Sequence, residues 1–272
     1  MKVDVDSILV WQKFNTYNFI EDTHSYYYNG DRVRYSVTQF LSRFSEEFDS
    51  EGVSKRYAEK HGLTQEEVLE QWKRKGEISS TAGTIIHSFM ENAKRGKTFN
   101  VDYSLADKLG IRDEVEERVN ILLPQAKAFH QDTLNRLYPI QLEYTVGIKD
   151  YIAGNIDLLC WNERAQEFQI WDYKNVKSLD VKPGPFSKKC FYPFDDYMDT
   201  NFMHYSMQLY TYKEILERGL GIKIGGCYLV QFNYAKKDAN FEVYPCTNVQ
   251  KECSIALDNL ITECQLDGNE EF

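Results

Sequence analysis

The sequence lacks the features that mark several large classes of protein. No apolar run in its 272 residues approaches 18 residues in length, and no basic start is followed by an apolar core. A membrane-spanning helix needs about 18 or more such residues, and a secretory signal needs that basic start. We therefore expect a soluble, cytoplasmic protein with no membrane partner. Low-complexity runs and internal repeats are also missing, which argues against disorder.

Cysteine pairs of the CxxC type are absent as well. The six cysteines stand at positions 160, 190, 227, 246, 253 and 264. In a chain without a secretory signal, such residues are usually reduced thiols, and several should be buried. Cys246, Cys253 and Cys264, near the C-terminus, are the candidates for cluster ligands. Their spacing fits no standard metal site, so we expect no Fe–S cluster.

Positive charge is in short supply. The chain has 32 Lys and Arg against 42 Asp and Glu, a formal net charge of −10. This balance argues against a protein that binds nucleic acid through overall charge, but a local basic groove stays compatible with it. The hydrophobic content of 42% and aromatic content of 14% are typical of a globular chain with a substantial core. Nothing indicates an oligomeric state.

Three expected strands between residues 141 and 177 carry four chargeable side chains: Glu143, Asp157, Asp172 and Lys174. Apolar runs at 156–161 and 168–173 flank a polar link, which is typical of a hairpin. Asp172 and Lys174 share one strand face because successive side chains alternate. A solvated ion pair at a strand end is the simplest interpretation of these two. Asp157 on the neighbouring strand favours a shared, partly buried cluster instead.

Periodicity and turn signals supply the other elements. Asn29-Gly30 predicts a two-residue hairpin turn within the first 36 residues. Residues 178–201 combine proline, aromatic and charged residues without a clear period, which indicates a long loop that could act as a lid or binding loop. The expected helices and strands are a helical region at 38–76, a helix at 79–97, a helical segment at 111–137 that Pro124 kinks or splits, a helix at 202–219, a β-hairpin at 225–246 and a C-terminal helix at 248–266.

Two expected helices carry further candidates. Lys73 and Arg74 should close the helix that Thr64 and Glu67 begin with capping-box spacing. Such a run is usually a solvated helix end, and a phosphate contact is the alternative. On the next helix, capped by Ser80 or Thr81, a lone His87 is more often structural than a metal ligand.

In order along the chain these signals resemble the RecB-type branch of the PD-(D/E)XK nuclease superfamily. The family pattern is GxxH, GxxD, (D/E)xK and QxxxY. The matching segments, over about residues 80–234, are Gly83–His87 (one residue longer than the pattern), Gly154–Asp157, Asp172–Lys174 and Gln208–Tyr212. Ser36-Val37-Thr38 is similar, less specifically, to phage and mitochondrial single-strand exonucleases. Four cysteines around the core, found in one subgroup, are not present.

The resemblance implies an α/β, restriction-endonuclease-like core in which a mixed central sheet is flanked by helices. It implies one or two Mg²⁺ or Mn²⁺ ions held by Asp157, Asp172, His87 and the Tyr173 carbonyl, which suits phosphodiester hydrolysis. Lys174, with a pKa lowered by burial beside the metal, would position or deprotonate water, or stabilise transition-state charge. The resemblance also implies that Glu143 binds a second metal ion or orients a ligand, and that Gln208 and Tyr212 contact metal-bound groups or DNA.

We expect a metal-dependent DNA nuclease, an exonuclease on single-stranded or end-containing DNA in replication, recombination or repair; the resemblance also fits a phage setting. The alternatives are a structure-specific endonuclease, a silent DNA-binding or assembly component with the same fold, and a chance pattern in an unrelated metal-binding protein. An N-terminal region (1–78) should precede the nuclease core (79–272). The basic residues expected to contact DNA are Lys182, Lys188 and Lys189 in the long loop, with Lys73 and Arg74.

Overall fold

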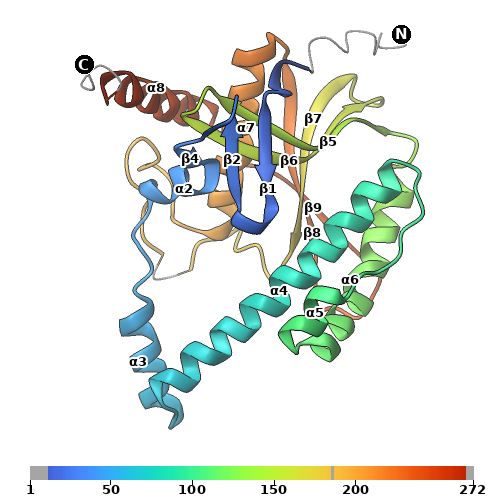
Figure 1. Cartoon of the computed structure of the whole chain (residues 1–272), viewed down its shortest axis with the longest axis vertical. Helices are drawn as coiled ribbons and strands as arrows, with labels where there is room; N and C mark the ends of the chain where they lie inside the picture. Colours follow the sequence, from blue (N-terminus) through green and yellow to red (C-terminus); the bar gives the residue numbers. More distant parts are fainter. Residues whose placement is uncertain (1–11, 185–186, 268–272) are drawn as a thin grey trace.

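A six-stranded mixed sheet forms the centre of the structure, a computed structural model that describes residues 12–184 and 187–267 (Figure 1). The α/β class with a mixed sheet flanked by helices is therefore confirmed. The strands of this sheet are β4 (Tyr35–Ser36), β5 (Leu137–Ile148), β6 (Ile152–Asn162), β7 (Glu167–Asn175), β8 (Ile224–Phe232) and β9 (Glu242–Pro245).

Strand β6 pairs with three other strands of the sheet: β5 along one edge, and β4 and β7 along the other. Strand β5 pairs with β6 along its length in antiparallel fashion. On the other edge, β4 pairs in parallel with the start of β6, at Ile152 and Ala153. Strand β7 pairs antiparallel with the end of β6, from Leu158 onward. Residues 154–157 of β6 consequently face a gap between β4 and β7, and side chains there can enter a cavity instead of a ladder.

The remaining strands extend the sheet and add a small second one. Strands β7 and β8 are parallel, and β8 and β9 form the expected antiparallel hairpin. The second sheet consists of β1 (Tyr17–Ile20), β2 (Ser25–Tyr28) and β3 (Asp31–Arg32). Asn29 and Gly30 connect β2 to β3 with φ values of 51° and 97°. Positive φ at both positions is the two-residue hairpin turn that the Asn-Gly pair predicts.

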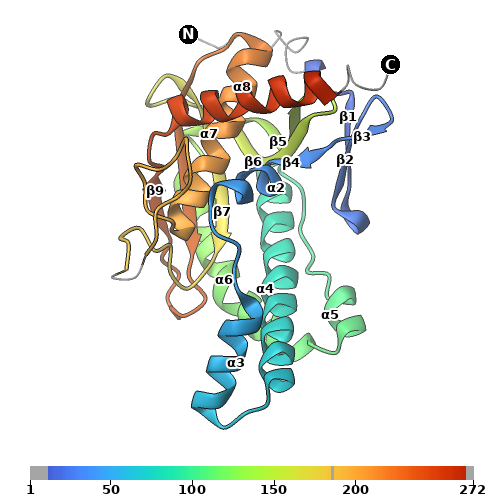
Figure 2. The same cartoon turned by 90° about the vertical axis from the view of Figure 1, so that its left-hand side faces the viewer.

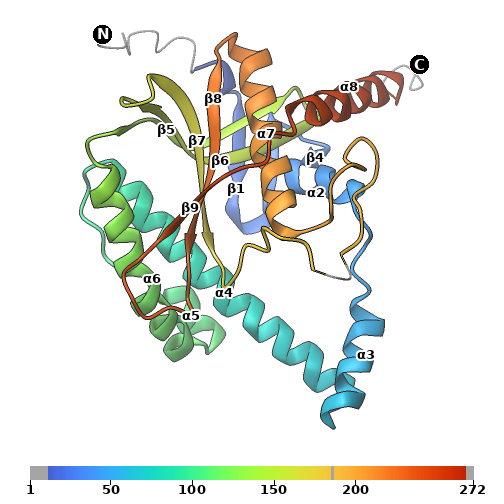
Figure 3. The same cartoon turned by 180° about the vertical axis from the view of Figure 1, so that it is seen from behind.

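Helices cover both faces of the central sheet (Figures 1 and 3). Ile86, Phe89 and Phe129 of α4 and α6 pack against Trp171 and Phe232 on one face. The opposite face is covered by α7, α8 and α2. The helices are α2 (Val37–Leu41), α3 (Ser50–His61), α4 (Gln65–Lys94), α5 (Ser104–Leu109), α6 (Arg112–Thr133), α7 (Asn201–Leu220) and α8 (Gln250–Asp267). Short 3-10 turns lie at Gln12–Phe14, Glu21–Thr23 and Ser42–Phe44.

Helix α4 is longer than the sequence indicates. Thr64 and Glu67 form the predicted capping box, and Gly96, with φ 66°, lies two residues beyond the helix end at Lys94. The interruption expected near residue 76 was wrong, because the 30 residues form one helix. Gly76 costs about 1 kcal/mol relative to alanine, which the buried face that α4 presents to α6 and the sheet can offset. Lys73 and Arg74 therefore lie inside a helix, and Ser80 and Thr81 are not caps.

Most other expectations agree with the structure. The long loop carries no helix in its described part, only a bridge between Lys189 and Met198. The split expected at Pro124 is not found, because α6 continues through it as one helix. All six cysteines are free and buried. None of the helices in the described ranges is long and apolar enough to cross a membrane. The division of the chain at 78/79 stays a prediction, and α4 runs across that position.

Candidate active site

A cavity of about 400 Å³ opens where the gap in the sheet faces α4, α7 and strand β2. Side chains from six parts of the chain line it, and most of them are polar. The residues that line it include Ser36 and Thr38 before and in α2, Ser79, Ser80 and His87 on α4, Asn155 and Asp157 on β6, Asp172 and Lys174 on β7, and Gln208 and Tyr212 on α7. The four sequence segments of the family pattern therefore meet in one place.

Asp157 lies at the centre of this cavity. Its Oδ2 accepts a hydrogen bond from the backbone N–H of Tyr173 at 2.8 Å. The carboxylate thus takes the place of a ladder partner where β7 leaves β6. The same oxygen lies 3.4 Å from Nδ1 of His87. One carboxylate therefore fixes the position of both the neighbouring strand and the histidine.

His87 connects α4 to the sheet. Its Nε2 lies 3.0 Å from the carbonyl oxygen of Tyr173, while Nδ1 faces Asp157. The side chain retains 29% of its exposure, so solvent or a ligand can reach it. His87 therefore does more than support the fold. Both of its ring nitrogens contact groups of the cluster, and its side chain lines the cavity.

Glu143 reaches the cluster through an unusual backbone conformation. Leu142 pairs with Leu158 and Tyr144 with Ile156, so Glu143 lies across from Asp157 on the adjacent strands. Its φ is +49°, which is uncommon for a residue with a side chain and costs of order 1 kcal/mol or more. Asn155 Nδ2 donates to its Oε2 at 2.6 Å. This conformation directs the carboxylate toward the site.

Ligand atoms of His87, Glu143 and Asp157 all lie within 4.8 Å of one another. Two carboxylates and an imidazole make a donor set that suits a divalent cation such as Mn²⁺ or Mg²⁺. The Tyr173 carbonyl, which contacts His87, borders the same space. Among the described residues this is the one such group of three. The chain can therefore hold a metal ion here, and the chemistry of the donors fits one.

Asp172 and Lys174 form a separate pair beside this cluster. They project from the same face of β7, as expected, with Lys174 Nζ 2.6 Å from Asp172 Oδ2. Both side chains are largely buried: Lys174 keeps 17% of its exposure and Asp172 keeps 6%. The solvated ion pair that the sequence suggests for these two residues is therefore wrong. The ammonium also lies 4.5 Å from the ring centre of Tyr205, within cation–π range. Lys174 is thereby held at the edge of the cluster.

The charges of the site change one another's protonation. Burial opposes a charged His87, but the carboxylates of Asp157 and Glu143 outweigh it and raise the pKa to about 9. Burial and the charge of Asp157 raise the pKa of Glu143 to about 8. Burial raises the pKa of Asp172 to about 6, against the pull of Lys174. The pKa of Lys174 is raised, since two carboxylates outweigh its burial. The lowered pKa of Lys174 that the sequence predicts beside a metal ion is not found in the protein without a metal.

Gln208 and Tyr212 complete the wall of the cavity on α7. Gln208 Nε2 donates to the hydroxyl of Tyr212 at 3.0 Å. Gly154 lies against that ring, and a Cβ on it would come within 2.6 Å of Tyr212 Cε1. The glycine of the GNID segment is needed for this close approach. In contrast, a Cβ on Gly83 would lie 3.5 Å from the Asn175 amide, an ordinary contact.

The basic residues predicted to contact DNA lie outside the cavity lining. Lys188, in the long loop, forms an ion pair with Glu46. Arg74 is held by Glu114 of α6, and Lys73 lies 3.9 Å from Glu77. Lys182 and Lys189 are exposed. Their role in binding stays a prediction, and the ion pair of Arg74 shows that it helps to join α4 to α6.

Two site residues were missed from the sequence. Asn155 positions Glu143 and is itself held by the Thr145 hydroxyl at 3.1 Å. Tyr205 contacts Lys174. Asn155 belongs to the GNID segment, two residues before Asp157 on the same strand, so the sequence could have indicated that both side chains lie on one face. Nothing in the local sequence marks Tyr205, because its contact depends on how α7 packs on the sheet.

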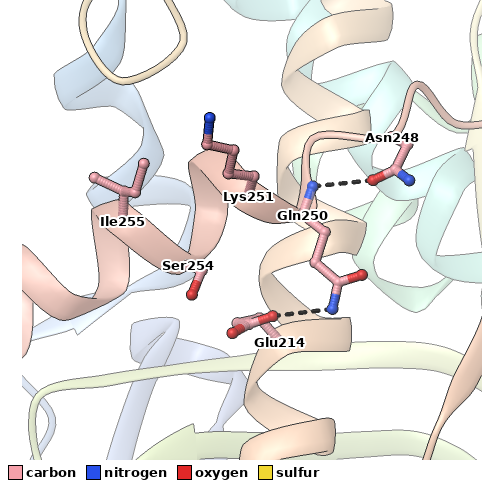
Figure 4. Close-up of a pocket in the computed structure, with 6 residues that line it drawn as sticks. All are labelled: Glu214, Asn248, Gln250, Lys251, Ser254 and Ile255. Atoms are coloured by element: carbon pink, nitrogen blue, oxygen red, sulfur yellow. Dashed lines mark hydrogen bonds between the residues drawn. The ribbon is translucent and has the colours of Figure 1, made fainter.

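A second cavity, of about 570 Å³, lies between α7 and α8 (Figure 4). Several of its polar groups join the two helices. Gln250 Nε2 donates to Glu214 at 3.2 Å and to Glu217 at 2.6 Å, while Arg218 binds Glu214 at 2.8 Å. This arrangement joins the two helices, and no cluster of ligand atoms like that around Asp157 occurs here within the described ranges.

Comparison with known proteins adds little to this geometry. No protein-family model matches the chain, and no curated protein matches it. Among the solved structures that match is a crystal structure from Eubacterium rectale described as a "putative exonuclease". The identity is 11%, the TM-score is 0.40, and the match covers 67% of this chain. The chain spans 63% of the length of that structure. Because the TM-score is low, function has to be argued from the chain's own residues.

Proposed function

We propose that the protein is a metal-dependent nuclease of the PD-(D/E)XK superfamily that hydrolyses phosphodiester bonds in DNA. The observation that carries the proposal is the meeting of two groups at one cavity, which all of their residues except Glu143 line. The first is the donor set of His87, Glu143 and Asp157, within 4.8 Å. The second is the buried pair of Asp172 and Lys174 beside it. Acidic ligands next to a buried lysine suit phosphodiester hydrolysis, which needs both a metal and a positive group.

Each part of the site has a chemical task. His87, Glu143, Asp157 and the Tyr173 carbonyl would hold Mg²⁺ or Mn²⁺, and Asp172 lies next to this set. A bound ion supplies a water of lowered pKa and neutralises phosphate charge. Lys174 places a fixed ammonium where charge grows on the phosphate oxygens. Burial strengthens that interaction because little water screens it.

Exonuclease action on single-stranded or end-containing DNA is the form of activity that we propose. The resemblance to single-strand exonucleases includes Ser36-Val37-Thr38, and the structure places these residues in the lining of the same cavity. A structure-specific endonuclease would use the same chemistry on another substrate. A silent assembly component would have no use for the buried pair of Asp172 and Lys174, whose burial costs free energy.

The test is degradation of end-labelled linear single-stranded DNA with Mg²⁺ or Mn²⁺, beside a closed circular substrate. We expect loss of the linear DNA, intact circles, and no reaction with EDTA or with Lys174→Ala. Cleavage of circles would replace the exonuclease with an endonuclease. A folded protein that cleaves neither DNA nor RNA with either metal would contradict the proposal and leave the assembly component.

A further inference from the structure

Helix α3 and the first part of α4 form an arm that projects from the body of the protein (Figures 1 and 2). We define the arm as residues 48–76. Helix α3 packs along α4 here through buried Ala58 and Val68. The arm is continuous with the candidate active site, because His87 stands farther along the same helix α4.

Three aromatic side chains gather on this arm. Phe48 and Tyr57 each lie near the indole of Trp72, with ring centres 6.1 and 6.3 Å apart. Phe48 is 65% exposed and Tyr57 is 40% exposed. Single exposed apolar residues are common, but two exposed rings that contact a third, half-buried ring form a patch of the kind that marks interaction surfaces. We call Phe48, Tyr57 and Trp72 the aromatic cluster.

One face of α4 leads from this cluster to the site. Trp72, Gly76, Ser79, Gly83 and His87 lie within about 80° of one another around the helix axis, at 3.6 residues per turn. Ser79, Gly83 and His87 line the candidate active-site cavity. A Cβ on Gly76 would meet nothing within 4 Å. Small side chains therefore leave a track of about 22 Å, at 1.5 Å per residue, between the cluster and His87.

We propose that the aromatic cluster binds single-stranded DNA by base stacking and feeds it along α4 to the metal site. This proposal rests on the proposed function and narrows its substrate. Bases of a single strand offer free faces to aromatic rings, and each such stack contributes about 1–3 kcal/mol. Bases in a duplex are already stacked on one another. The cluster therefore selects unpaired DNA over double-stranded DNA.

The charge of the arm favours stacking as the main source of affinity. Residues 48–76 contain six Asp and Glu and six Lys and Arg, so the arm carries no net positive charge. A surface with this balance attracts the phosphate backbone weakly, although Lys55, Lys60 and Lys75 form no ion pair in the part of the chain that the structure describes. Binding at the arm should therefore depend less on salt than binding through a basic groove does.

The first test measures binding of fluorescein-labelled oligothymidylate by anisotropy, with EDTA present so that no cleavage occurs. Phe48→Ala and Tyr57→Ala should each weaken binding by about 5-fold to 100-fold, the range that stacking energies imply. Phe48→Leu should weaken it nearly as much, while Phe48→Trp should retain it. Leu105→Ala, at a 48% exposed position on α5, serves as the matched control and should bind as the unaltered protein does.

The second test separates this proposal from the proposed function. Hydrolysis of thymidine 5′-p-nitrophenyl phosphate, which is too short to reach the arm, should be unchanged in Phe48→Ala, while KM for long single strands rises. Unchanged oligothymidylate affinity in both alanine variants would overturn the arm and leave the nuclease. Loss of DNA binding in these variants without any hydrolysis by the unaltered protein would overturn the nuclease and keep the arm. A change in self-association in place of DNA affinity would identify a protein interface and overturn the proposal.

Discussion

Glu143 faces Asp157 across two adjacent strands, and its backbone holds a φ of +49° to do so. The carboxylates come together although each raises the cost of charging the other. Both the backbone and the electrostatics are therefore unfavourable at this position. Such costs are typical of a site that is retained for function and not for stability.

The change Glu143→Gly should raise stability and lower activity. Glycine accepts positive φ without a steric penalty, so we expect a gain of about 1 kcal/mol in the free energy of unfolding. The metal cluster loses one of its three donors, so DNA cleavage should fall by at least about 10-fold, as expected even for outer-shell changes at metal sites. Thermal unfolding and a cleavage assay would measure the two effects.

Two controls separate strain from charge at this position. Glu143→Gln keeps the strained backbone, so it should lose activity without the stability gain expected from relief of φ. Lys149→Gly, at another positive φ of 47°, should gain stability and keep activity. If Glu143→Gly cleaves DNA as well as the unaltered protein does, Glu143 is not a ligand.

The change Lys174→Met should abolish cleavage and also weaken the fold. It leaves Asp172 buried without its ion-pair partner, which typically costs about 3–5 kcal/mol. Adding Asp172→Asn should restore much of the lost stability but no activity. Urea unfolding of the single and double variants would show this pattern, and an additive loss in the double variant would contradict the pairing.

A matched control for Lys174 is provided by Lys94. It is a second partly buried lysine, whose ammonium donates to the Thr133 hydroxyl at 2.9 Å, and burial lowers its pKa to about 8. Because its partner is neutral, Lys94→Met should leave no buried charge behind. We expect cleavage to continue at the unaltered rate in this variant, which would show that losing a buried lysine is not enough to stop the reaction.

The two glycines of the family pattern should respond differently to alanine. Gly154→Ala forces a Cβ against Tyr212 Cε1, so we expect a loss of about 1–3 kcal/mol and weaker cleavage through displacement of Tyr212 and Gln208. Gly83→Ala meets only an ordinary contact and should stabilise α4 by about 0.5–1 kcal/mol. Thermal melts of both variants test this, and equal melting temperatures would contradict the difference in packing.

Replacing Lys188 and Lys189 together with alanine should weaken DNA binding and reduce its salt dependence. Lys188 is 63% exposed in its pair with Glu46, so stability should change by less than about 1 kcal/mol. Each lost phosphate contact lowers the slope of log affinity against log salt by about one. Lys251→Ala, beside the second cavity, is the control. An unchanged slope in the double variant would place the long loop outside the DNA path.

Local signals were reliable where a short stretch controls its own conformation. Asn29-Gly30 predicted its turn, the apolar runs predicted β6 and β7, and Thr64 with Glu67 predicted the start of α4. They failed at residue 76, where a glycine and nearby hydroxyl residues imitate the end of one helix and the start of another. Packing of α4 against α6 and the sheet overrides that weak preference.

The sequence by itself determined which residues are available to the site: the segments with His87, Asp157, Asp172 and Lys174 were recognisable from residue type and order. Only the tertiary structure decided that these residues form two groups, a three-residue ligand cluster and a separate ion pair. The register of β5 on β6 brings Glu143 into the cluster with His87 and Asp157, while Asp172 pairs with Lys174. The physical reason is that distances between side chains on different strands depend on register and on backbone φ, which residue type and order within one segment do not specify.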